Sequence, residues 1–153
     1  MHSSNATMSN DALLQPEACN CLAVRQAARQ VTQFYDQFLA PVGLRATQFS
    51  VLAKLQRLGP LRINALAAEL VMDRTTLGRT IQPLVRRRLI AIVRGNPDRR
   101  CKELHLTELG ANRLREAVKY WIRAQDRFAE IFGAERTADL CALLHAVSAS
   151  ELV

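Results

Sequence analysis

The stretch IAIVRGNPDRRCKELHLTELG, from Ile90 to Gly110, contains the strongest local signal in the chain. Two short apolar runs, Ile90–Val93 and Leu104–Leu106, flank a Gly-Asn-Pro-Asp turn. Strand-forming runs on either side of such a turn are typical of a β-hairpin. Arg99 and Arg100 follow the turn directly, so the stretch predicts a hairpin with two cations at its tip.

The residues before the hairpin, 73–89, are dense in Arg and Thr and predict an amphipathic helix. Asp73 is a good N-cap, because its carboxylate can accept hydrogen bonds from the free backbone N–H groups of the first turn. Pro83 removes one helical hydrogen bond and should bend the helix. The residues predicted to face the core are Leu77, Ile81, Leu84 and Leu89. A basic helix followed by a basic hairpin is the order of a winged helix-turn-helix.

The rest of the chain predicts a mainly α-helical fold of about six helices around that hairpin. We expect a flexible arm over residues 1–16. The other predicted helices cover about 17–40, ended by Pro41 and Gly43; from Thr47, as the N-cap, to Gly59; 63–70, with Leu66 and Leu70 buried; from Thr107, as the N-cap, to Gly133; and 134–149.

Positive charge is concentrated in one part of the chain. Residues 60–106 hold ten arginines and lysines against four acids, a net charge of +6, whereas the whole chain carries +7. A basic block of this kind within a globular pattern indicates a polyanionic partner, and its alternative is an ordinary solvated arginine-rich surface. With the helix and hairpin, it favours duplex DNA.

Composition argues against several other classes. No apolar run reaches the roughly 18 residues of a membrane helix, and no secretory signal is visible. Four scattered cysteines are few for a disulfide scaffold, so we expect a cytoplasmic protein. The sequence has no glycine-rich phosphate loop, nucleophile elbow or metal cluster, so we expect neither an enzyme nor a cofactor or metal site.

The outer helices carry longer apolar stripes than one small lobe can cover. Val24, Val31 and Phe38 recur at helical spacing in the first helix, as do Leu114 and Phe128 in the fifth. Packing against a second copy of the chain is the simplest way to bury them. We therefore expect a homodimerisation region over 17–45 and 108–153, with a DNA-binding lobe over 46–107.

The chain resembles the MarR family of bacterial transcription regulators. The resemblance rests on Asp98-Arg99-Arg100, similar to the family's D-x-R wing, and on Leu104 to Gly110, similar to its L-x-L-T-x-x-G junction. It implies a homodimer that binds pseudo-palindromic duplex DNA, usually a repressor released by a small molecule or an oxidant. It also implies that Asp98 pairs with Arg100 and braces the wing, while Arg99 or Arg100 enters a minor groove; Asp98 could equally be a turn residue.

The residues expected to contact DNA follow from the outer face of the predicted 73–89 helix. Arg74, Thr75 and Arg79 lie near its N-terminus, where arginine can read guanine and threonine can contact a thymine methyl or a phosphate. Gln82 is one turn further along, within reach of base or backbone. Arg86 and Arg87 are expected to touch phosphate or, alternatively, to interact favourably with the helix dipole.

Cys21 stands fourteen residues before Tyr35, a spacing similar to that of hydroperoxide sensors in the MarR family. Arg25 occupies the position of those sensors' other tyrosine, and it could favour the Cys21 thiolate from one helical turn away. Cys19 should point to another face of the same helix. The alternatives are an inert Cys21 and a small aromatic effector, in whose cleft Arg25, Tyr35 and Trp121 would lie.

Two readings of different class remain at this point. The first is a DNA-binding transcription regulator. The alternative is a winged-helix interaction module that binds protein or RNA without sequence-specific recognition of duplex DNA. The outward set of Arg74, Thr75 and Arg79 beside a basic hairpin favours the first.

Overall fold

The computed structural model describes residues 14–95, 98 and 100–153. The chain forms two units, residues 1–34 and 35–153. The helix α2 (Asn20–Leu39) crosses from one unit to the other, and a 3-10 turn, η1 (Pro16–Ala18), precedes it. Most of the predicted arm, residues 1–13, lies outside the described residues. No helix in the described part of the chain is both long enough and apolar enough to cross a membrane.

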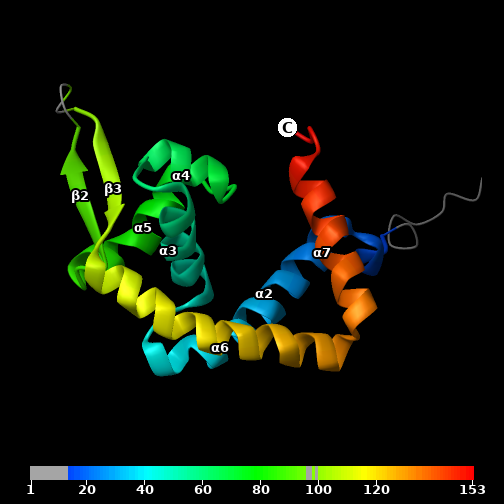
Figure 1. Cartoon of the computed structure of the whole chain (residues 1–153). Coiled ribbons are helices and arrows are strands. Elements are labelled where there is room, and N and C mark those ends of the chain that lie inside the picture. The colour runs from blue at the N-terminus through cyan, green and yellow to red at the C-terminus, as the bar shows by residue number, and fades with distance from the viewer. Residues whose placement is uncertain (1–13, 96–97, 99) are drawn as a thin grey trace, which may run out of the picture. The chain divides into compact units, whose positions relative to one another are not determined.

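The second unit is a mainly helical winged helix-turn-helix (Figure 1). Its elements after α2 are η2 (Ala40–Val42), α3 (Ala46–Leu58), β1 (Leu61–Arg62), α4 (Ile63–Glu69), α5 (Arg74–Arg86), β2 (Ile90–Arg94), β3 (Lys102–Leu106), α6 (Glu108–Phe132) and α7 (Ala134–Ala149). The predicted helices and hairpin are therefore present.

Two predicted N-caps are confirmed. Asp73 accepts a hydrogen bond from the backbone N–H of Thr76 at 2.8 Å, and the Thr107 hydroxyl accepts one from the N–H of Gly110 at 2.9 Å. Each cap provides a hydrogen-bond acceptor for one of the backbone N–H groups that have no intrahelical partner at the start of a helix. They are local in sequence, which is why the sequence alone could place them.

The start of α3 was predicted wrongly. The helix begins at Ala46, with Arg45 rather than Thr47 at the N-cap position. The Asp36 carboxylate accepts from the backbone N–H of Ala46 at 2.7 Å, and the Gln48 side chain accepts from that of Arg45 at 3.0 Å. Because Asp36 belongs to the preceding helix, this cap was hidden from a local reading of the sequence.

Two smaller expectations also need correction. The first long helix starts at Asn20 instead of about residue 17, so Cys19 precedes it. The Cys19 sulfur lies 3.5 Å from the backbone nitrogen of Leu22, in the first turn of α2. In α4, Leu66 is buried as expected, but Leu70 is only half-buried, because the helix has already ended at Glu69.

The sheet has three antiparallel strands in the order β1-β3-β2. Ile90 pairs with Leu106 and Arg94 with Lys102, which fixes the register of the predicted hairpin. The strand β1 was not predicted, because two residues give no periodicity. It pairs with β3 through Leu61 and Leu104.

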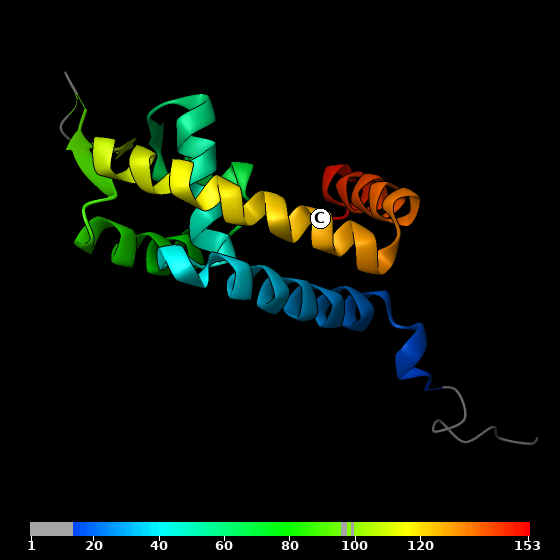
Figure 2. The ribbon, with the colours of Figure 1, turned by 60° about the horizontal axis from the view of Figure 1, so that its bottom comes forward.

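The core of the lobe lies between α3, α4, α5 and the sheet. Leu77, Ile81, Leu84 and Leu89 are all buried there, as the 73–89 pattern predicted. The first half of α6 packs on the same core through Leu114 and Ala117. Figure 2 shows α6 continuing from the end of the hairpin to α7.

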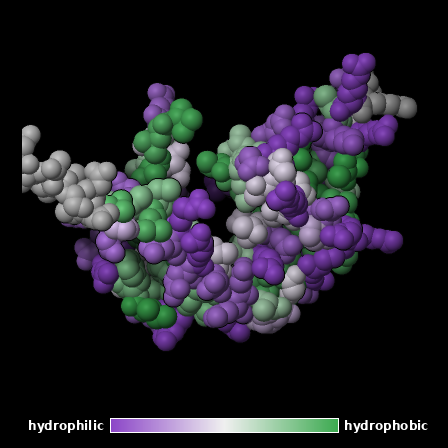
Figure 3. All heavy atoms as spheres, turned by 180° about the vertical axis from the view of Figure 1, so that it is seen from behind, coloured by the Kyte–Doolittle hydropathy of each residue, from purple (hydrophilic) through white to green (hydrophobic). Residues whose placement is uncertain are grey.

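Large apolar side chains beyond the core are exposed. Ile131 on α6 and Leu143, Leu144 and Val147 on α7 are between 43% and 66% exposed. Hydrophobic surface is visible on α7, at the left of Figure 3. Exposed apolar surface of this kind on a helix is typical of a protein interface.

Candidate nucleic-acid interface

The outward face of α5 is built by helical geometry. Its core residues occupy one side, which leaves Arg74, Thr75 and Arg79 exposed on the other. At 100° per residue, these three and Gln82 and Arg86 fall within an arc of about 140°. These five predicted contact residues are exposed and lie on one face, whereas Arg87, also predicted to touch phosphate, follows the last residue of α5.

The N-terminus of α5 is capped by the Asp73 side chain. Besides accepting from the Thr76 N–H, Asp73 accepts a hydrogen bond from the Thr76 hydroxyl at 2.6 Å. These two bonds hold the pKa of the Asp73 carboxyl below its ordinary value. The cap therefore fixes the first turn, from which Arg74 and Thr75 project.

The C-terminal end of α5 is anchored by a different interaction. The Arg87 guanidinium donates to the carbonyl oxygen of Gly43 at 2.6 Å, and Arg113 of α6 donates to that of Val42 at 3.1 Å. Both carbonyls lie at the turn that follows α2. Arg86 and Arg87 are both exposed, but Arg87 is held by this hydrogen bond within the protein.

At the tip of the wing, the structure describes Asp98 and Arg100, whereas Arg99 lies outside the described residues, with Asn96 and Pro97 of the predicted turn. The Asp98 carboxylate accepts from the backbone N–H of Arg100 at 3.0 Å. The backbone N–H of Gly95 donates to the carbonyl of Cys101 at 2.6 Å and closes the base of the tip. Asp98 is thus hydrogen-bonded to the main chain of Arg100.

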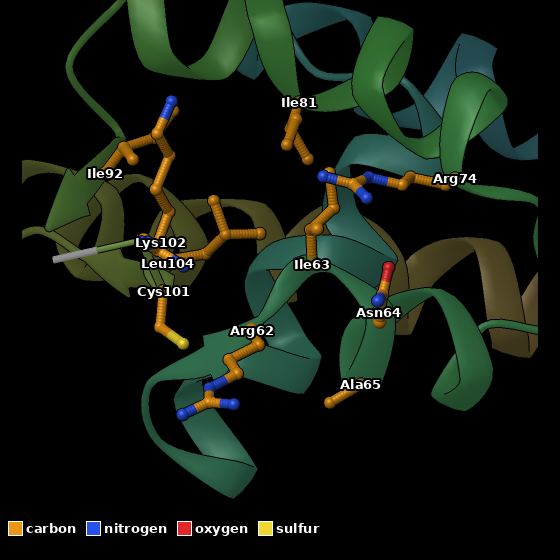
Figure 4. A pocket seen from close by; sticks show the side chains of 11 residues that line it. Arg62, Ile63, Asn64, Ala65, Arg74, Ile81, Ile92, Cys101, Lys102 and Leu104 are labelled. Atoms are coloured by element: carbon orange, nitrogen blue, oxygen red, sulfur yellow. The ribbon is translucent and has the colours of Figure 1, made fainter. Parts of the chain in front are cut away.

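A groove of about 850 Å³ lies between the wing, the start of α4 and the start of α5 (Figure 4). Its large apolar side chains are Ile63, Ile81, Ile92 and Leu104, and its cationic side chains are Arg62, Arg74, Arg100 and Lys102. In Figure 4 the Arg74 side chain extends between Ile63 and Ile81. The groove joins the two predicted contact elements, α5 and the wing, into one basic surface.

Arg62 and Lys102 were counted in the basic block, but sequence reasoning did not assign them to the site. Arg62 joins it because β1 pairs with β3, which brings residue 62 beside Glu103 and next to Lys102 in the sheet. The only signal in the sequence was the position of Arg62, just after Gly59-Pro60 and just before a helix.

The residues considered for an effector or redox site belong to different units of the chain. Cys21 and Arg25 are exposed, one turn apart on α2, in the first unit. In the second unit, Trp121 stacks on Phe49 with ring centroids 5.9 Å apart. Tyr35 there donates a hydrogen bond to the Gln125 side chain, and burial, followed by the nearby Cys141, raises the pKa of its hydroxyl.

Comparison with known proteins identifies this arrangement. The family model of the MarR family matches residues 44–102. The M. tuberculosis transcriptional regulator MosR, solved in complex with DNA, is 36% identical over 88% of this chain and 99% of its own, with a TM-score of 0.73. The transcriptional repressor CouR, bound to a 23-mer DNA duplex, is 27% identical over 88% of this chain and 98% of its own, with a TM-score of 0.77.

A third solved structure resembles the chain in fold alone. BpsR of Bordetella bronchiseptica is 21% identical over 90% of this chain and 99% of its own, with a TM-score of 0.79. A search of curated protein sequences found no match.

Proposed function

Because the chain belongs to the MarR family of DNA-binding transcription regulators, we propose that it is a homodimeric repressor of a pseudo-palindromic operator. The observation that carries the proposal is the exposed face of α5, with Arg74, Thr75 and Arg79, beside a basic wing. Arginine and threonine on such a face can reach base edges in a major groove, and cations on the wing can reach phosphates or a minor groove.

Dimerisation is supported by the exposed apolar surface of α6 and α7. Leu143 and Ile131 are 66% and 63% exposed in the single chain, which is costly for side chains of this size. A two-fold dimer would bury them and would present two copies of α5 to half-sites about one helical turn apart. Repression is the activity that the similar protein CouR is named for.

We propose further that a small molecule or an oxidant releases the DNA. For the oxidant, the candidate is Cys21, with Arg25 one turn away on the same helix. For a small aromatic effector, the candidates in the second unit are Tyr35 and Trp121. Tyrosine has an ordinary pKa of about 10, so the Tyr35 hydroxyl is a neutral hydrogen-bond donor at physiological pH. Burial raises its pKa further, and this hydroxyl donates to the Gln125 side chain. This part of the proposal rests on the family resemblance and on residue chemistry.

Selection from a random duplex library tests the operator. The purified chain should enrich an inverted repeat with half-sites about 10 base pairs apart. Sedimentation of the free protein at micromolar concentration should give one species of twice the chain mass. Enrichment of a single unrepeated site, or a clean monomer, would rule out the dimeric repressor.

The release step is tested on the selected duplex with an organic hydroperoxide and with salicylate. If Cys21 is the sensor, peroxide should release the parent protein, whereas Cys21→Ser should keep its DNA. Cys19→Ser is the matched control and should respond like the parent. Release by salicylate in all three proteins would instead assign the switch to a small aromatic acid, and a parent insensitive to both compounds would contradict the proposed release.

A further inference from the structure

The groove between α5 and the wing lies where a DNA strand would have to pass. In a duplex, one sugar–phosphate strand separates each major groove from the neighbouring minor groove. A protein with a helix in one and a wing in the other therefore straddles that strand. In this chain the surface between the two elements is hollowed and open to solvent, with a volume of about 850 Å³.

The two unassigned cations stand on the elements that frame this groove. Arg62 comes from β1, at the start of α4, and Lys102 comes from β3, at the base of the wing. Both are exposed. Figure 4 shows Arg62 on the α4 side of the groove and Lys102 on the wing side.

Neither cation has another task within the described residues. Arg87 and Arg113 donate to main-chain carbonyls, but no hydrogen bond or ion pair joins the side chain of Arg62 or Lys102 to another described residue. The acid nearest to them in the sheet is Glu103, whose carboxylate lies 3.2 Å from the His105 ring instead. Their charge is therefore available to a ligand from outside.

We propose that this groove holds one sugar–phosphate strand of the bound duplex, with Arg62 and Lys102 as phosphate contacts from its two sides. The inference rests on the DNA binding of the proposed function and adds residues to it. Arg74, which extends between Ile63 and Ile81 at the groove, contacts the same strand. Base reading is thereby left chiefly to Thr75 and Arg79, which do not line the groove.

Charge-removing variants test the proposal through the salt dependence of binding. Arg62→Gln and Lys102→Gln are titrated from 0.05 to 0.3 M salt, against a 30-base-pair duplex of random sequence and against the selected operator. Each should weaken binding to both duplexes by the same factor, about three- to tenfold near 0.1 M salt. Each should also reduce the magnitude of the negative slope of log K against log salt by about 0.9, since one phosphate contact is lost.

Two further variants exclude other causes. Lys119→Gln removes one exposed charge from α6, away from the groove, and should leave the slope unchanged. Arg62→Lys keeps the charge and should restore most of the slope, which a merely structural role of the arginine would not predict.

Two outcomes would overturn the assignment. One is an unchanged slope in both groove variants while the parent binds DNA. The other is a loss confined to the operator, which would make these residues base readers. The parent could show no preference for an inverted repeat while the groove variants still reduce the magnitude of the salt slope. In that case the operator proposal fails and the strand assignment stands.

Discussion

Gly110 lies directly against the main-chain carbonyl of Leu89, so a Cβ at position 110 would overlap the Leu89 oxygen. The same added atom would meet the Leu106 side chain at 2.8 Å. Thr107 secures this junction, because its hydroxyl donates to the carbonyl of Arg88 at 2.7 Å and its backbone N–H donates to that of Leu89 at 3.2 Å. The glycine of the L-T-x-x-G motif thus allows α6 to approach the end of α5.

Gly110→Ala should therefore destabilise the protein. A backbone oxygen cannot rotate away, so α6 must shift, and overpacking of this kind costs about 1–3 kcal/mol. Urea unfolding should show a lower midpoint. The matched control is Gly78→Ala in α5, where nothing lies within 4 Å of the added Cβ. That variant should gain about 0.5–1 kcal/mol from helix propensity, and equal effects at both glycines would contradict the assigned contact.

Val71→Gly should stabilise the protein. Val71 follows α4 with a φ of 51°, a left-handed conformation that costs a β-branched residue about 1–2 kcal/mol. Its N–H donates to the carbonyl of Ala68 and that of Met72 to Ala67, the pattern of a helix end that favours glycine. Because Val71 is 75% exposed, little burial is lost.

Thermal unfolding measures the effect of Val71→Gly. We expect a gain of about 1 kcal/mol, since the relief of strain exceeds the added entropy of the unfolded chain. Val71→Ala is the control, because alanine keeps a Cβ in the same left-handed conformation and should gain less. A glycine variant no more stable than the alanine variant would argue against strain at this turn.

The stability that Asp73 contributes should depend on pH. Hydrogen bonds from Thr76 hold the pKa of the folded carboxyl below its ordinary value of about 3.9. The ionised cap therefore stabilises the protein above that value, and its contribution is lost as the pH falls through the lower, folded pKa. Asp73→Asn, which cannot ionise, should be less stable than the parent at pH 7, with a difference that shrinks below about pH 4.

Urea titrations of both proteins between pH 7 and pH 3 would follow that difference. Glu135→Gln serves as a control for general charge effects. Glu135 lies in the first turn of α7, a helix that has no side-chain cap hydrogen bond. If the difference in free energy of unfolding between Asp73→Asn and the parent became larger on acidification, the hydrogen bonds from Thr76 would not favour the ionised cap.

Arg79→Ala should cost about 1–3 kcal/mol on the selected operator and should relax its base preference, if this arginine reads a guanine. Arg100→Ala, at the wing, should instead weaken binding to all duplexes alike and should reduce the magnitude of the negative salt slope by about 0.9. Fluorescence titrations on the operator and on a scrambled duplex distinguish the two patterns. Normal operator binding by Arg79→Ala would remove α5 as the reading element.

Features that depend on neighbours in sequence could be predicted from the sequence alone. The caps of α5 and α6 join residues three apart, and the hairpin strands lie on either side of one short turn. The span of α7, 134–149, follows from the break at Gly133 and from helical periodicity. The outward side of α5 follows from the same periodicity, which is why its predicted contact residues are exposed together.

Only the tertiary structure decided features that join distant segments. The first turn of α3 is capped by Asp36 from another helix, so Thr47 was a reasonable but wrong choice. The two-residue strand β1 exists because β3 offers it a partner, and that pairing brings Arg62 to the groove. Arg86 and Arg87 are adjacent arginines, yet only Arg87 donates a hydrogen bond to the Gly43 carbonyl. Hydrogen bonds and steric contacts between segments far apart in the chain leave no periodic signal, so their outcome emerges only when the chain has folded.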